Sequence, residues 1–243
     1  MLMHMHPLFR IYFGDAKDNL FKDNYLNLPK EKNILELEPF SNLKKMMGIE
    51  HLIFLKQVHR AEGLVVQSKA EAEKIEPFSV EGDFIITNVA HVGIGIMTAD
   101  CLPIILFDKR NQVVAVIHAG WRGSAGNIVG MAFKKMKETY NTEVEDVTVI
   151  FGPSAKVCCY KVGDDFIEQL GEFEFLDRVV QRRSDGLYFD LPAFNVIMLE
   201  ELGFKKEAFK LGYNDCTVCN PSFHSVRRQK DGSGRNMTVV CLM

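Results

Sequence analysis

The chain has 243 residues, of which 47% are hydrophobic and 25% are charged, and its formal net charge at pH 7 is −3. These values are ordinary for a soluble globular protein and allow a sizeable core. They exclude a general electrostatic attraction to nucleic acid or to an anionic membrane, so we expect neither as a partner. No apolar stretch of the sequence approaches the ~20 residues that span a bilayer, and the N-terminus lacks the pattern of a signal peptide.

Cysteine usage indicates a reducing compartment. The six cysteines do not form the pattern of a disulfide scaffold in a chain of this length, and Cys158 and Cys159 are adjacent. We therefore expect a cytoplasmic protein. The sequence shows no internal repeat, low-complexity tract or Pro/Gly/Ser linker, which favours one domain over residues 1–243, with an irregular segment at 1–25. The sequence does not indicate an oligomeric state.

Hydrophobic periodicity and capping residues predict alternating strands and helices. In chain order these are a short strand at Leu8–Phe13, a helix at Asn42–Met47 ended by Gly48, a strand at Leu52–Gln57, a solvated connection at 68–78, strands at Asp83–Thr87, Val92–Met97, Pro103–Phe107 and Val113–Ile117, a helix at Ala125–Tyr140, a strand at Val147–Phe151, a helix at Asp164–Leu170, a helix from the N-cap Asp190 to Leu202, and a strand at Met237–Leu242. Several of the central strands are expected to form hairpins. The fold class is therefore α/β (α+β), a layered fold with a mixed sheet flanked by helices.

Three candidate metal ligands follow predicted strands. His59 ends the string Gln57-Val58-His59, Cys101 ends Ala99-Asp100-Cys101, and His118 opens His118-Ala119-Gly120-Trp121-Arg122-Gly123. One thiolate and two imidazoles suit a zinc ion and leave a coordination position open for water or substrate. Asp100 is the candidate for orienting a ligating histidine. Two alternatives stay open: a metal-free hydrolase with Cys101 as nucleophile and His118 as base, and residues with no catalytic role.

Two other segments carry candidate binding groups. A helix start after Trp121-Arg122 would offer backbone N–H groups and the Arg122 guanidinium to an anion such as phosphate, unless Trp121 packs in the core and Arg122 makes a structural ion pair. Near the C-terminus, Phe223–Arg228 mixes aromatic, polar and cationic side chains, which fits either a segment that reaches a substrate ring or phosphate or a solvated strand. The preceding Cys216-Thr217-Val218-Cys219 is interpreted as a loop that shapes the wall of the pocket. A structural zinc knuckle is less favoured because zinc ribbons need two such pairs.

With these strings in view, the chain resembles the laccase-domain family, also called the multicopper polyphenol oxidoreductase or YfiH/YlmD family. The resemblance covers roughly residues 26–243, and its most specific strings are Ala99–Pro103 and His118–Gly123. It continues through further motifs, which are Gln57-Val58-His59, Gly152-Pro153, Cys158-Cys159-Tyr160, Asp190-Leu191, Asn195, Cys216-Thr217, Ser225, Arg227-Arg228 and Gly234-Arg235.

The resemblance implies a CNF1/YfiH-like fold in which His59, Cys101 and His118 hold a catalytic zinc ion. The implied activity is phosphorolysis of the purine nucleosides adenosine, inosine, guanosine and methylthioadenosine, with adenosine deamination as a second reaction. The implied partners are a small-molecule nucleoside and phosphate. The candidate substrate- or phosphate-binding residues are Arg122, Asn27, Arg227 and Arg228.

Three other functions are considered. Some bacterial relatives are peptidoglycan editing factors, which suggests a hydrolase of cell-wall precursors that uses the same Cys/His site. The family's name suggests a copper-dependent polyphenol oxidase, but seven histidines are too few for several copper centres, so copper is the less favoured metal. A non-enzymatic metal-binding or partner protein is favoured only by two departures from the family's pattern, namely Lys161 in place of Glu and Pro39-Phe40 in place of an Asn-Arg pair. A third departure, His224 and Val226 in place of the usual aromatics, concerns the substrate preference.

Overall fold

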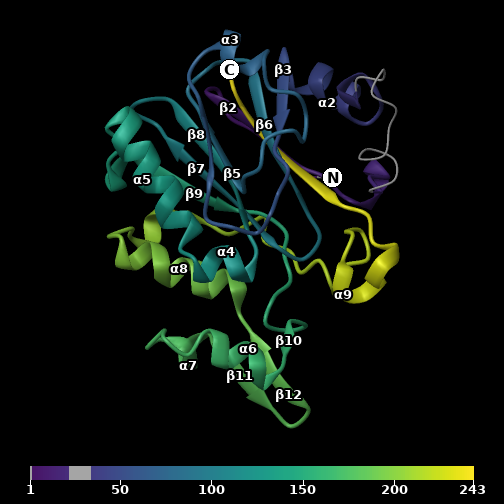
Figure 1. The fold of residues 1–243 in the computed structure, drawn as a ribbon, viewed down its shortest axis with the longest axis vertical. Helices are drawn as coiled ribbons and strands as arrows, with labels where there is room; N and C mark the ends of the chain where they lie inside the picture. The colour runs from purple at the N-terminus through teal and green to yellow at the C-terminus, as the bar shows by residue number, and fades with distance from the viewer. Residues whose placement is uncertain (1, 22–33) are drawn as a thin grey trace.

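The computed structural model describes residues 2–21 and 34–243. Two β-sheets pack face to face, and helices cover the outer face of each sheet (Figure 1). This arrangement confirms the layered α/β class. The two packed sheets lie at the centre of the molecule. Their central strands are apolar on both faces and are therefore buried on both faces.

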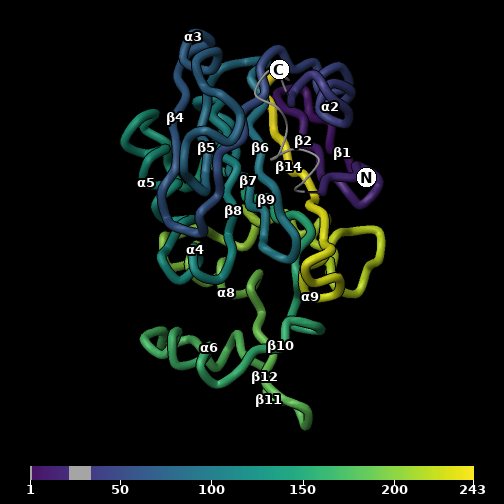
Figure 2. The backbone as a smooth tube through the Cα atoms, turned by 45° about the vertical axis from the view of Figure 1, so that its right-hand side comes forward, coloured from purple at the N-terminus to yellow at the C-terminus, as the bar shows by residue number. Residues whose placement is uncertain are grey.

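The five-stranded sheet has the order β1-β2-β14-β6-β3. Its strands are β1 (Leu2–Met5), β2 (Phe9–Phe13), β3 (His51–Phe54), β6 (Val92–Thr98) and β14 (Asn236–Leu242). The C-terminal strand β14 lies in the middle and runs antiparallel to both β2 and β6, as Figure 2 shows by its position between purple and teal segments. Strand β3 is parallel to β6, so both strands end at the same edge of the sheet.

The six-stranded sheet has the order β13-β9-β7-β8-β5-β4. Its strands are β4 (Gly63–Val66), β5 (Phe84–Thr87), β7 (Leu102–Asp108), β8 (Val113–Ala119), β9 (Val147–Phe151) and β13 (Phe209–Lys210). Strands β7 and β8 form an antiparallel hairpin, as the sequence predicts, and β5 is antiparallel to β8. The register pairs Leu102 with Ala119, so the beginning of β7 lies beside the end of β8.

The alternation of side chains along each strand separates the hydrophobic core into layers. In β8, Val114 and Val116 face the other sheet, while Val113, Ala115 and Ile117 belong to the cluster beneath the helices. All seven residues of β8 are buried, because both faces of the sheet are covered. The two sheets therefore hold each other and the helices through continuous apolar contact.

The outer faces of the sheets are covered by amphipathic or apolar helices. Helices α5 (Ile128–Tyr140) and α8 (Leu191–Glu201) cover the six-stranded sheet, and α2 (Phe40–Met47) covers the five-stranded one (Figure 1). Helix α8 begins at its N-cap Asp190, whose side chain accepts a hydrogen bond from the Ala193 N–H. Each helix thus buries one apolar face against a sheet.

A small third sheet and two short helices lie apart from the two large sheets, at the bottom of Figures 1 and 2. This sheet has the order β10-β12-β11. Its strands and the remaining elements are β10 (Lys161–Val162), β11 (Val180–Arg183), β12 (Gly186–Phe189), α3 (Lys69–Ala72), α4 (Trp121–Ala125), α6 (Asp164–Gln169), α7 (Leu176–Val179), α9 (Val226–Gln229) and the 3₁₀ turns η1 (Ala16–Asp18), η2 (Ile34–Glu36), η3 (Val144–Asp146), η4 (Lys206–Ala208) and η5 (Lys230–Gly232). Among the described residues, none of the helices has the length and apolar character needed to cross a membrane.

The predicted elements are present with small shifts of boundary, and three segments differ. The helix predicted at Ala125–Tyr140 begins only at Ile128, because Asn127 adopts a left-handed conformation and caps α5 with its side chain. Within residues 2–21, the strand predicted at Leu8–Phe13 is present as β2, and a further strand, β1, precedes it. The pairing of β1 with the apolar strand β2 supplies the hydrogen bonds that order it. The connection at 68–78 contains the single helical turn α3.

Candidate metal centre

Three strand ends bring His59, Cys101 and His118 together. His59 follows β3, while Cys101 lies where the chain leaves β6 in one sheet and enters β7 in the other. Because β3 and β6 are parallel, their ends share an edge, and the β7–β8 hairpin places His118 beside Cys101. The sequence-predicted trio is therefore assembled where the two sheets meet.

The loop that carries His59 is held by side-chain hydrogen bonds to both sheets. The Gln57 amide pairs with the backbone of Met97, donating to its carbonyl at 2.9 Å and accepting from its N–H at 2.7 Å. The Val58 and Arg60 N–H groups donate to the Asp83 carboxylate at 3.1 and 2.9 Å. These contacts fix the backbone on either side of His59, which adopts a φ of +61°.

The ligand atoms of the trio lie within binding distance of a common point. One ligating atom from each of His59, Cys101 and His118 can be chosen so that all lie within 4.8 Å of one another. The two imidazole rings meet edge to face, with centroids 4.6 Å apart. A Cβ atom added at Gly120 would lie 3.0 Å from the Cys101 sulfur and 3.2 Å from His59 Cδ2, so glycine is needed beside the site. Two nitrogens and one sulfur at this spacing fit a borderline-soft divalent ion.

The Cys101 thiol and the His118 imidazole stabilise each other's charged forms. Burial opposes ionisation of Cys101, but the nearby His118 and hydrogen bonds from both imidazoles lower its pKa to about 6. Burial also opposes protonation of His118, but the Cys101 thiolate and the Asp83 carboxylate raise its pKa to about 9. A thiolate is the form of cysteine that binds a metal ion, so the protein environment prepares Cys101 for that role.

Asp83 is the carboxylate that orients a ligating histidine. It is fully buried and lies 2.7 Å from His118 Nδ1, which leaves Nε2 to bind a metal ion. Burial opposes its ionisation, but hydrogen bonds from His118 and from the Arg60 N–H lower the pKa of Asp83. The assignment of this role to Asp100 from the sequence is wrong.

Asp100 acts instead on the neighbouring loops. Its carboxylate accepts hydrogen bonds from the Thr217 hydroxyl at 2.7 Å and from the Arg227 N–H at 2.8 Å. Its backbone has a φ of +86°, which lets the chain turn from one sheet into the other immediately before Cys101. Asp100 therefore joins the metal site to the segment that begins α9.

The trio opens into a cavity of about 630 Å³. Its lining combines apolar side chains, cationic side chains and the three candidate ligands, and comprises Leu55, Lys56, Gln57, His59, Phe78, Met97, Ala99, Asp100, Cys101, His118, Val226, Arg227 and Arg235. A volume of this size holds a small organic molecule. The site is thus a candidate metal centre that opens into a cavity of ligand size.

The two C-terminal arginines predicted from the sequence have different surroundings. Arg227 lines the cavity, and its guanidinium carbon lies 3.9 Å from the centroid of the Tyr160 ring. The Arg228 guanidinium donates to the backbone carbonyls of its own loop, those of Thr217, Val218, Asn220 and Phe223. Arg228 therefore holds its own loop, whereas Arg227 lines the cavity and donates to the Lys161 carbonyl at 2.7 Å.

Arg122 is not among the residues that line the cavity. The Arg122 guanidinium carbon lies 4.4 Å from the centroid of the Trp121 ring, and Trp121 packs against Phe166. Helix α4, which follows Gly120, has only five residues. Asn27 lies outside the described residues. Arg235 lines the cavity instead, a position that the sequence indicated only as part of the family's pattern.

The family model described as multi-copper polyphenol oxidoreductase laccase matches residues 36–243. The chain belongs to this family. The matched region contains His59, Cys101, His118 and Asp83, so the described site lies within the part of the chain that carries the family relationship.

Curated relatives and a solved structure agree with this membership. The chain is 40% identical over 163 residues to a purine nucleoside phosphorylase of Aquifex aeolicus, spanning 67% of this chain and 72% of the relative. It is 33% identical over 201 residues to adenosine deaminase RL5 from an unknown prokaryotic organism, spanning 80% and 76%. The crystal structure of YlmD from Geobacillus stearothermophilus superposes with a TM-score of 0.73 at 27% identity, covering 83% of this chain and 77% of that one.

Proposed function

We propose that this protein is a zinc-dependent purine nucleoside phosphorylase with adenosine deaminase activity. The observation that carries the proposal is a Cys/His/His ligand set at the wall of a cavity that also presents arginine side chains. The relatives named purine nucleoside phosphorylase and adenosine deaminase support an enzyme of this class. The proposed substrates are adenosine, inosine, guanosine and methylthioadenosine.

The cavity offers separate surroundings for the parts of a nucleoside. Apolar side chains of Leu55, Phe78 and Met97 suit a purine ring. Arg227 and Arg235 suit a phosphate, because one planar guanidinium group can donate hydrogen bonds to two phosphate oxygens at once. We therefore assign the phosphate to the Arg227 side of the cavity and not to Arg122, whose guanidinium lies over the Trp121 ring.

Phosphorolysis forms a bond between a phosphate oxygen and the ribose C1′ while the C1′–N9 bond breaks. The products are ribose 1-phosphate and the free purine, and the proton lost by the hydrogen phosphate ends on the purine nitrogen. Arg227 would balance the charge of the phosphate and hold it in the cavity. Asp83 would keep His118 in the tautomer that presents Nε2. A zinc ion bound by the trio would supply Lewis-acid chemistry for activating an oxygen nucleophile.

A polyphenol oxidase is disfavoured by the ligands. Within residues 2–21 and 34–243, the trio is the only group of three or more potential ligands that contains histidine, and the other such group is made of four cysteines. A multicopper centre needs several histidine-rich sites. One Cys/His/His site fits a single ion better.

Chromatography of nucleosides incubated with the zinc-loaded protein tests the proposal. We expect release of hypoxanthine from inosine that depends on added phosphate, and release of ammonia from adenosine. Cys101→Ala should abolish both, whereas Cys241→Ala, which alters a buried cysteine in β14, should leave both unchanged. Absence of both products with zinc verified at the site would refute the proposal. Turnover of a UDP-muramyl precursor instead would support the cell-wall hydrolase.

A further inference from the structure

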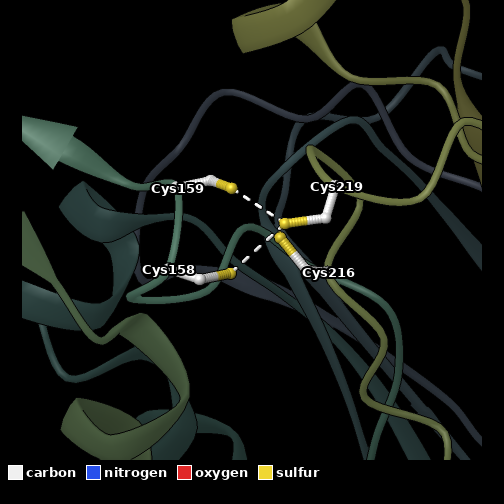
Figure 3. A group of neighbouring side chains, drawn as sticks. All are labelled: Cys158, Cys159, Cys216 and Cys219. Carbon is white, nitrogen blue, oxygen red and sulfur yellow. Dashed lines mark hydrogen bonds between the residues drawn. The ribbon is translucent and has the colours of Figure 1, made fainter.

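Four of the six cysteines gather in a second cluster away from the trio. Cys158 and Cys159 come from the loop that follows β9, and Cys216 and Cys219 come from the loop that precedes α9. Figure 3 shows the four side chains pointing toward one another from the two loops. The sulfur atoms all lie within 4.8 Å of one another.

The sequence disfavours a zinc knuckle because it contains only one Cys-x-x-Cys pair. The structure supplies the second pair from Cys158 and Cys159, which are adjacent in the chain and both approach Cys219. Their sulfur atoms lie 3.5 and 2.9 Å from Cys219 Sγ. Four thiols from two loops therefore meet at one point. A search of the sequence for two Cys-x-x-Cys motifs does not detect this cluster.

We propose that Cys158, Cys159, Cys216 and Cys219 bind a structural zinc ion as four thiolate ligands. Four sulfurs about 2.3 Å from a tetrahedral zinc ion lie about 3.8 Å from one another. The sulfur separations of Cys159 and Cys158 from Cys219, 2.9 and 3.5 Å, lie below this value, and the 4.8 Å within which all four sulfurs lie is above it. A soft, closed set of four thiolates favours zinc over a hard cation.

Backbone N–H groups surround the Cys216 sulfur. Those of Cys219, Lys156 and Val218 donate hydrogen bonds to it. Two of these donors come from the second and third residues after the first cysteine of the Cys-x-x-Cys loop. Such contacts stabilise a metal-bound sulfur, because they place positive hydrogen atoms against its charge.

Cationic side chains balance the charge of the cluster. Four thiolates and one zinc ion carry a net charge of about −2. The Arg183 guanidinium donates to the carbonyls of Val157 and Cys158, and the Arg228 guanidinium donates to those of Val218 and Asn220. Each cysteine loop therefore has a guanidinium on its backbone, which lowers the electrostatic cost of gathering the thiolates.

A zinc ion here would fix one wall of the cavity. Thr217, between the two cysteines of its loop, donates to the Asp100 carboxylate beside Cys101. Tyr160, directly after Cys159, lies beneath the Arg227 guanidinium. The ion would therefore act as a positioning element for Asp100 and Arg227, without contacting the substrate.

Zinc content separates the two sites. Protein purified under reducing conditions and equilibrated with zinc should contain about two ions per chain by elemental analysis. Cys101→Ala should retain about one, and the double variant Cys158→Ser/Cys219→Ser should also retain about one, while Cys241→Ala should retain both. This pattern does not depend on catalysis, so a failed activity assay would leave it intact.

Cobalt provides a second readout that does not require the variants to be fully stable. Co²⁺ added to metal-free Cys101→Ala protein should give intense sulfur-to-metal charge-transfer absorption and visible bands of a tetrahedral thiolate site, displaced by zinc. About one zinc ion per chain in the reduced wild-type protein, lost in Cys101→Ala, would overturn the proposal. A disulfide between Cys159 and Cys219 that persists under reducing conditions would overturn it as well.

Discussion

Replacing Asp83 with Asn should weaken metal binding at the trio without disturbing the loop that carries His59. One carboxylate oxygen of Asp83 contacts His118 Nδ1 at 2.7 Å, and the other accepts both backbone N–H groups of the His59 loop. In Asp83→Asn the amide oxygen can keep the two backbone donors, which turns the amide NH₂ toward His118. Nδ1 must then accept a hydrogen bond, so the proton moves to Nε2, which can no longer bind a metal ion.

The magnitude follows from the lost contact. A hydrogen bond to a charged group contributes about 1.5–3 kcal/mol, and loss of such a partner lowers metal affinity by about 10–100-fold. Because about 1.4 kcal/mol corresponds to a tenfold change, the two ranges agree. We expect the zinc affinity of the trio to fall by about 10–100-fold.

The assay measures zinc affinity by letting the protein compete with a chromophoric chelator for zinc. The ion bound at the trio is identified as the one that Cys101→Ala loses. Asp108→Asn is the matched control, because Asp108 is an equally buried carboxylate that caps the β7–β8 turn by accepting from Arg110 and Asn111. The control should leave the affinity unchanged. An unchanged affinity in folded Asp83→Asn would refute the proposed role of Asp83.

Three further changes test separate parts of the site. Gly120→Ala should lower the zinc affinity of the trio, because the added Cβ would lie 3.0 Å from the Cys101 sulfur. The control Gly212→Ala, whose added Cβ would have no atom within 4 Å, should leave that affinity unchanged. Equal zinc affinities of the two variants would contradict the close approach at Gly120. Arg227→Ala should raise KM for phosphate about tenfold, the loss expected for one charged hydrogen bond, and steady-state kinetics with varied phosphate would show it. Arg228→Ala should instead lower the melting temperature and leave that KM nearly unchanged, because its guanidinium binds backbone carbonyls; a stable variant with a raised KM would reverse the two assignments.

The sequence predicted the candidate ligands because each lies at the end of an apolar strand or shortly after it. His59, Cys101 and His118 all follow runs of buried residues, and the order of strands brings those ends together. The hairpin of β7 and β8 was predictable from its short turn. The division of the strands between two sheets was not, since β6 and β7 are consecutive and equally apolar, yet belong to different sheets.

Asp83 and the cysteine cluster could not be found from local patterns. Asp83 precedes an apolar strand, where a carboxylate usually marks the beginning of the strand, and its partner His118 lies 35 residues away. Cys158 and Cys219 are separated by 61 residues. Asp83 meets His118 through the pairing of β5 with β8, and the two cysteine loops meet at an isolated bridge between Ser154 and Cys216. A single sequence does not encode either contact as a motif.

The most direct test of the account is the anomalous diffraction signal of a zinc-loaded crystal, collected at the zinc absorption edge. The account predicts a peak within about 2.0–2.3 Å of a His59 ring nitrogen, the Cys101 sulfur and His118 Nε2, with the remaining side of the ion facing the cavity. A peak that lacks any one of these three ligands, or zinc only at the cysteine cluster, would contradict it.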